Sequence, residues 1–256
     1  IEVEDSFRYD KTPLRDGFDY DQFFEAYFEL RTAVGEKNRE RVEKALGQIE
    51  SMGIEHPDVT LLKINHVSMI RGMEEQAWDM ARQLYETDGE NKGARYWYAR
   101  AALDVEEMPV EPEELEQVIA GLLEEEPENP GFWQICGGFL KRQNRLEQAL
   151  EAFRRAYEYS DGWEYVQEEI QETADALSRK MEDEGCEDVW ALAGMCWTGK
   201  RYDRVRELLE GYEPEEGKRL SWLMLMAGSC HGLEDFEAAL SYQERIWDGF
   251  KPEERP

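Results

Sequence analysis

One stretch decides the fold: residues 129–162 read NPGFWQICGGFLKRQNRLEQALEAFRRAYEYSDG. Its apolar residues recur at intervals of three and four, which predicts two amphipathic helices. The polar pair Asn144 and Arg145 separates the two halves and predicts a tight turn between them. The small residues Gly137 and Ala149, one in each half, predict that two antiparallel helices approach closely. The stretch is therefore expected to form a helix–turn–helix unit.

This spacing resembles the tetratricopeptide repeat, a helix–turn–helix unit of about 34 residues. Similar but weaker spacings occur over 23–56, 58–91 and 92–129, and two more follow residue 185. The resemblance implies an all-α fold, a right-handed α-solenoid of about six such helix pairs plus one extra helix. With Pro130 as position one, the residues that carry the match are Trp133, Gly137, Leu140, Ala149, Phe153 and Ala156.

The register breaks once, because 22 surplus residues stand between the fourth and fifth units. Their apolar residues, from Trp163 to Met181, keep helical spacing and predict one amphipathic helix over 163–184. That helix is either a spacer packed within the solenoid or a boundary between two halves; we favour the spacer. The expected organisation is an extended arm or linker (1–18), four repeats (19–162), the lone helix (163–184), two repeats (185–250) and a polar tail (251–256).

Composition excludes several classes of function. The chain carries 59 acidic and 30 basic side chains, a net charge of -29. Such a molecule is expected to avoid nucleic acid and anionic membrane surfaces. None of the usual nucleotide-binding, protease or hydrolase motifs is present, and the four cysteines form no CxxC pair. We therefore expect no enzyme activity, no cofactor, no metal and a reducing, cytoplasmic setting.

In proteins with this repeat, the first helix of each unit lines a concave binding groove. Among the thirty positions that the resemblance assigns to the groove, only Asp104 and Glu187 are acidic, where about seven would be expected from the chain average. Partial burial alone would also lower the number of charged residues at these positions, but it would not explain why basic residues remain there. The groove residues predicted by the resemblance are Tyr27, Arg31, His66, Tyr96, Arg100, Gln134, Lys141, Arg142, Trp190, Trp197 and His231.

The resemblance implies a non-enzymatic protein–protein interaction scaffold whose concave groove binds a protein or peptide segment. Because the groove pairs cations with aromatic rings, we expect a segment that is acidic, anchored by aromatic residues, or both. The alternative is an architectural or self-associating acidic module whose groove is filled by its own N-terminal arm. Arg8, Lys11 and Arg15 of that arm favour this alternative. The sequence leaves the identity of the partner and the oligomeric state open.

Overall fold

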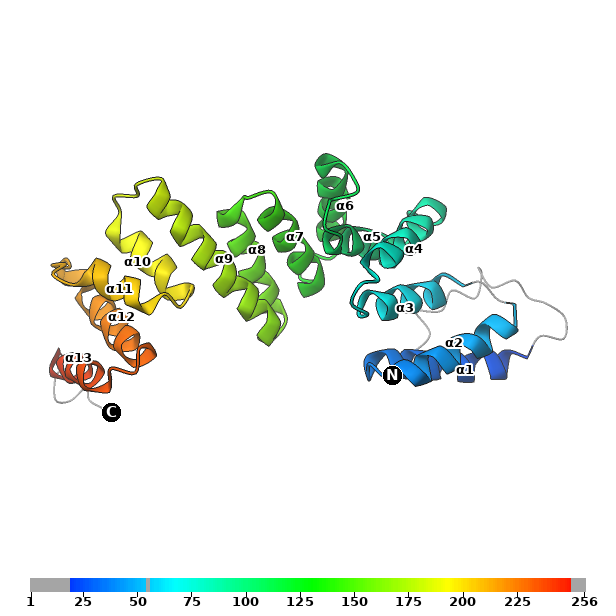
Figure 1. Ribbon diagram of the computed structural model, residues 1–256, viewed down its shortest axis with the longest axis horizontal. Coiled ribbons are helices and arrows are strands. Elements are labelled where there is room, and N and C mark those ends of the chain that lie inside the picture. Colours follow the sequence, from blue (N-terminus) through cyan, green and yellow to red (C-terminus); the bar gives the residue numbers. More distant parts are fainter. Residues whose placement is uncertain (1–18, 54–55, 250–256) are drawn as a thin grey trace. The chain divides into compact units, whose positions relative to one another are not determined.

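The computed structural model describes residues 19–53 and 56–249 (Figure 1). These ranges contain thirteen α-helices and one short 3-10 helix, and within α1–α6 and within α7–α13 each α-helix packs against the next along the chain. The predicted all-α fold of successive antiparallel, tetratricopeptide-like helix pairs is confirmed. The predicted arm (1–18) and tail (251–256) lie outside the described residues.

The described helices form two compact units, which divide the chain after Pro127. In the first unit α1, α3 and α5 are the first helices of three pairs and α2, α4 and α6 are the second helices. The first helices also pack against one another, α1 on α3 and α3 on α5. They therefore make one layer, and the second helices cover one side of it. The bounds are α1 Tyr20–Gly35, α2 Arg39–Ser51, α3 Pro57–Ser68, α4 Glu74–Thr87, α5 Lys92–Asp104 and α6 Pro112–Glu125.

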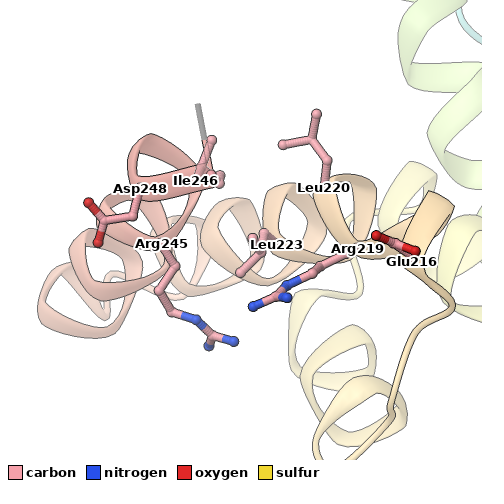
Figure 2. Close-up of a pocket in the computed structure, with 8 residues that line it drawn as sticks. Glu216, Arg219, Leu220, Leu223, Arg245, Ile246 and Asp248 are labelled. Carbon is pink, nitrogen blue, oxygen red and sulfur yellow. The ribbon is translucent and has the colours of Figure 1, made fainter. Parts of the chain in front are cut away.

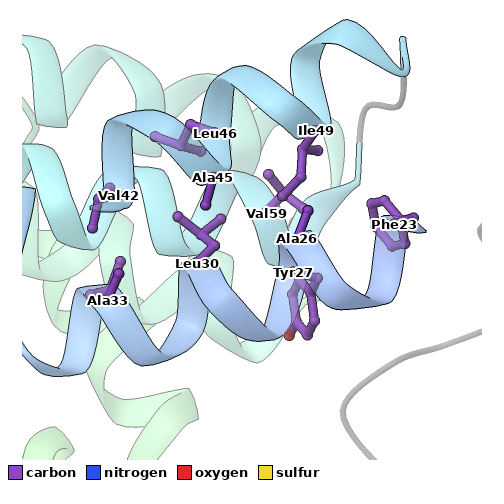
Figure 3. Packing of buried hydrophobic residues seen from close by; sticks show 11 residues of the cluster. Phe23, Ala26, Tyr27, Leu30, Ala33, Val42, Ala45, Leu46, Ile49 and Val59 are labelled. Carbon is purple, nitrogen blue, oxygen red and sulfur yellow. The ribbon is translucent and has the colours of Figure 1, made fainter. Parts of the chain in front are cut away.

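Buried apolar residues that recur at helical spacing hold the first unit together (Figure 3). Phe23 and Leu30 of α1 meet Val42 and Ile49 of α2, and all four side chains are fully buried. Val59 of α3 joins the same cluster and ties the next pair to the first. Because each pair has an apolar face left over, stacking the pairs is what removes that face from water.

The second unit begins with α7, and α7 and α8 are the two helices predicted over residues 129–162. Helix α9 occupies almost the same residues as the lone helix predicted over 163–184, and it packs against α8 and α10. Two further pairs follow, α10 with α11 and α12 with α13. The bounds are α7 Pro130–Arg142, α8 Leu146–Tyr159, α9 Glu164–Asp183, α10 Val189–Thr198, α11 Tyr202–Leu209, α12 Arg219–Gly232 and α13 Phe236–Gly249.

A common turn sets the register of most pairs. Two residues before the second helix of these pairs the backbone has a positive φ, a conformation that ends a helix and reverses the chain. In α7–α8 the next amide, Arg145 N–H, donates to the Leu140 carbonyl at 2.9 Å. The same bond joins Asn38 to Ala33, Arg201 to Cys196 and Asp235 to Cys230. The turn residues are Lys37, Gly72, Asn144, Lys200 and Glu234. The α5–α6 pair has a longer connection, since α5 ends at Asp104 and α6 begins at Pro112.

Candidate partner-binding surface

Charge is divided unequally between the helices of the first unit. The second helices α2, α4 and α6 carry twelve acidic and four basic residues, whereas α1, α3 and α5 carry five of each. The first-helix layer is therefore close to neutral in a strongly acidic chain. An acidic partner segment would meet far less repulsion there than on the second helices.

The same division holds in the second unit. The first helices of its three pairs, α7, α10 and α12, contain no Asp or Glu and three basic residues. The second helices α8, α11 and α13 carry eight acidic and five basic residues, and α9 carries seven and two. Acidic residues are thus scarce over the whole length of the first helices, and not only at the individual positions predicted to line the groove.

Two predicted groove residues of the first unit are core residues. Tyr27 is only 5% exposed and stacks on Phe23 with ring centroids 6.3 Å apart. Burial, followed by the nearby Asp58 carboxylate, raises the pKa of the Tyr27 hydroxyl. His66 is 8% exposed, and burial lowers the pKa of its imidazole. Both side chains fill space between helices, so they offer a partner little surface.

The remaining predicted residues of this unit are accessible. Arg31 on α1 is exposed, and Tyr96 and Arg100 on α5 are half-buried. Arg100 donates to the Asp104 carboxylate at 3.2 Å, which holds the guanidinium against α5. Large apolar side chains are exposed on the same layer: Phe28 on α1 is 41% exposed, and Met69, directly after α3, is 42% exposed. The sequence reading missed Phe28, although its place three residues before Arg31 puts it on the same side of α1.

In the second unit, Lys141 is already paired within the protein. Its ammonium donates to Glu169 at 2.8 Å and to Glu172 at 2.9 Å, both on α9. Burial disfavours the charged amine, but these bonds outweigh burial and raise the pKa of Lys141. The lysine therefore fastens α7 to α9. Of the other predicted residues on α7, Gln134 is half-buried and Arg142 is exposed.

The two tryptophans of α10 serve mainly to pack helices. Trp190 stacks on Tyr212 at 6.2 Å and lies against the core of the last two pairs. Trp197 packs on Tyr202 at 5.2 Å and lies against the backbone of Gly228 on α12. His231 is exposed and meets the Phe236 ring edge-on at 5.6 Å. Lys141 thus contacts α9 whereas Trp197 contacts α11 and α12, so the structure does not bring these two predicted residues together.

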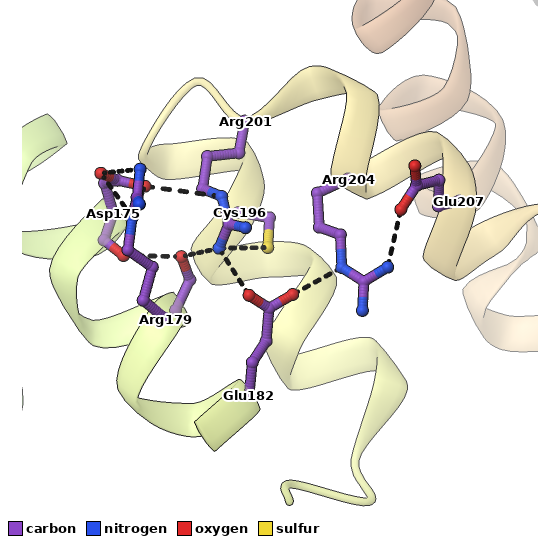
Figure 4. Close-up of polar contacts among 8 residues, drawn as sticks. Asp175, Arg179, Glu182, Cys196, Arg201, Arg204 and Glu207 are labelled. Carbon is purple, nitrogen blue, oxygen red and sulfur yellow. Dashed lines mark hydrogen bonds and ion pairs between the residues drawn. The ribbon is translucent and has the colours of Figure 1, made fainter. Parts of the chain in front are cut away.

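A network of ion pairs fastens α9 to the fifth helix pair (Figure 4). The Glu182 carboxylate accepts from Arg201 at 2.9 Å and from Arg204 at 2.5 Å. Arg201 also donates to Ser178 at 2.9 Å and approaches Asp175 at 3.5 Å. Burial would raise the pKa of Glu182, but the two arginines outweigh it and lower that pKa. The extra helix is therefore an integral part of the second unit.

A pocket of about 630 Å³ lies where the start of α12 meets the end of α13 (Figure 2). Arg219 and Arg245 line it together with Glu216 and Asp248, around an apolar floor that includes Leu223. The Arg245 guanidinium lies over the Trp222 ring, 5.1 Å from its centroid. The sequence reading missed this pocket because its residues come from both ends of the last pair.

The part of the chain that comprises residues 19–53 and 56–249 holds no cluster of three or more His, Cys, Asp or Glu side chains that could bind a metal ion. Likewise, none of its helices is both long and apolar enough to cross a membrane.

Comparisons with known proteins find remote similarity to this chain. No protein-family model matches the chain, and no curated protein does. Among solved structures, a mutant form of MamA is 13% identical with a TM-score of 0.45, over 75% of this chain and 95% of that one. A tetratricopeptide repeat protein from Parabacteroides merdae is 15% identical with a TM-score of 0.41, over 91% and 95%. PilF from Pseudomonas aeruginosa is 19% identical with a TM-score of 0.37, over 76% and 93%. The chain is a tetratricopeptide-like helical repeat protein, and the assignment rests on the helix pairs described above.

Proposed function

We propose that the chain is a non-enzymatic scaffold that binds an extended segment of a partner protein on the first helices of its first unit. The observation that carries this proposal is the charge division between the layers, five acidic and five basic residues against twelve and four. Packing alone does not require such a division, because the exposed sides of both layers face water.

The partner segment is acidic, carries aromatic or apolar anchors, or does both. Arg31 and Arg100 supply positive charge on this layer, and Phe28 and Met69 supply exposed apolar area. A chain of net charge -29 repels an acidic segment at long range. An acidic segment therefore binds only if its close contacts with these cations and apolar side chains outweigh that repulsion. The proposal needs no cofactor. The buried free thiols Cys196 and Cys230 fit a reducing compartment such as the cytoplasm.

The test compares two pairs of substitutions that change the net charge equally. Arg31→Gln with Arg100→Gln removes cations from the first helices, whereas Arg39→Gln with Arg82→Gln removes exposed cations from α2 and α4. Capture of partners from a lysate is quantified for the unaltered chain and for both variants. We expect a several-fold loss for the first pair alone. Equal loss in both variants would mean bulk electrostatics, and would contradict the assignment to this layer.

A further inference from the structure

The last helix of the described chain exposes an apolar stripe. Phe236 is 61% exposed, Leu240 is 56% exposed and Trp247 is 46% exposed, all on α13. Their spacing of four and then seven residues places them on one side of the helix. We call these three residues the end stripe. Three large apolar side chains in a row on a charged protein mark a surface that another element covers.

The equivalents of Phe236 and Leu240 elsewhere in this chain are covered, whereas the equivalent of Trp247, Tyr157, is 37% exposed. The pairs α7–α8 and α12–α13 have the same lengths of turn and second helix, with Asn144 and Glu234 as their turn residues. In that register Leu146 and Leu150 correspond to Phe236 and Leu240. Both leucines are buried, at 6% and 3% exposure, in a cluster with residues of α9.

Helix α9 therefore shows which kind of element fits this surface. Ala174 and Leu177 of α9 share the cluster with the two leucines, and Ile170 packs at its edge. These residues form the apolar side of an amphipathic helix, whose outer side is polar. After α13, the described part of the chain has no helix to play this role.

The charges beside the two surfaces differ at two positions. At the α7–α8 surface Lys141 binds the acidic side of α9, and Arg154 stands on α8. The corresponding residues of the last pair are His231 and Glu244. Glu244 belongs to an acidic row along one edge of the end stripe, with Glu237 and Asp248, and all three are exposed. The other two acids of this row, Glu237 and Asp248, have acidic counterparts on α8, so the last pair keeps the acids and lacks the cations of the covered surface. An acidic row without cations beside it calls for a basic helix.

We propose that the end stripe of α13 docks a basic amphipathic helix of a partner protein. The apolar side of that helix covers Phe236, Leu240 and Trp247, and its Lys or Arg residues meet the acidic row. A second copy of this chain is a poorer occupant, because its own α13 brings the same acids and its net charge is also -29. This surface is separate from the first-helix layer of the first unit, and either proposal can fail without the other.

The probe is a 20-residue peptide that keeps the apolar residues of α9 at their spacing and carries lysine at its exposed positions. A peptide with the unaltered α9 sequence is the acidic counterpart. Fluorescence anisotropy of labelled peptides measures the affinity of each for the whole chain. We expect the lysine peptide to bind at least about tenfold more tightly than the acidic one, and Leu240→Glu to weaken its binding by about the same factor. Leu240 is 56% exposed, so this variant is expected to fold, and circular dichroism checks that it does.

Two matched variants separate docking from general attraction to an acidic protein. Tyr159→Glu on α8 places the same new charge at another exposed aromatic residue, and it should leave peptide affinity unchanged. Glu237→Lys with Glu244→Lys should reduce the preference for the lysine peptide, whereas Glu113→Lys with Glu124→Lys on α6 should not. The proposal would be overturned if, in either comparison, the control variant changed peptide binding as much as the variant at the end stripe does. A dimer in sedimentation that Leu240→Glu converts to monomer would also overturn it, because the occupant would then be a second copy.

Discussion

The ring of Phe153 on α8 lies directly against the backbone of Gly137 on α7. A Cβ atom added at Gly137 would stand 2.6 Å from two carbons of that ring, which is closer than side chains approach in folded proteins. The sequence analysis paired Gly137 with Ala149, and Ala149 is indeed fully buried, but the close approach that requires glycine is to Phe153. The α7–α8 contact therefore depends on the absence of one methyl group.

Replacing Gly137 with Ala is expected to destabilise the second unit by about 1–3 kcal/mol, because the Phe153 ring has to shift within a packed core. Gly194 on α10 is the control, since a Cβ atom there meets nothing within 4 Å. Gly194→Ala should be neutral or stabilising by up to about 1 kcal/mol. Urea unfolding measures both variants, and equal effects would show that the helices do not meet as described.

The sequence pattern correctly predicted those features of the fold that depend on local contacts. Helical spacing and the turn at Asn144 located the α7–α8 pair, because both depend on local contacts within one repeat. Tyr27 was misplaced on the binding surface, since its stacking on Phe23 is set by how α1 packs. Lys141 was read as a groove cation because its partners Glu169 and Glu172 lie in the extra helix. A register derived from the repeat alone cannot predict contacts with a helix that lies outside the repeat.

Trp197→Ala is expected to lower the stability of the second unit by about 2–4 kcal/mol, because the indole fills the space between Tyr202 and Gly228. The sequence reading had treated this tryptophan as a ligand anchor. Thermal unfolding together with partner capture distinguishes the two roles. Reduced capture with an unchanged melting temperature would restore the anchor role and contradict the packing described for α10.

Acid should weaken the junction between α9 and the fifth helix pair. Arg204 and Arg201 hold the pKa of Glu182 below its ordinary value of 4.5, so its carboxylate stabilises the folded chain above that value. The contribution is lost as the pH falls through the lower, folded-state pKa. Glu182→Gln should therefore cost about 1 kcal/mol or more at neutral pH, and the difference from the unaltered chain should shrink below pH 4.5. Urea unfolding over this range gives the result, and a difference independent of pH would contradict it.

The four cysteines should fall into two classes of reactivity. Cys196 and Cys230 are buried, whereas Cys136 and Cys186 are half-buried. Burial raises the pKa of the Cys196 and Cys230 thiols above the ordinary value, which keeps them protonated and slow to react. A thiol reagent applied to the native protein should modify Cys136 and Cys186 first, as mass spectrometry of the products would show. Rapid modification of Cys196 or Cys230 would contradict the packing of α10 and α12.

The central claim is that a partner segment binds the first-helix layer of the first unit, and site-specific photo-cross-linking tests it most directly. Benzoylphenylalanine replaces Phe28 on α1 in one protein and the exposed Gln83 on α4 in another. Each protein is irradiated with its captured partners, and the cross-linked products are compared on gels and by mass spectrometry. We expect a discrete cross-linked partner from position 28 and none from position 83. A partner cross-linked from position 83 alone, or equally from both positions, would contradict it.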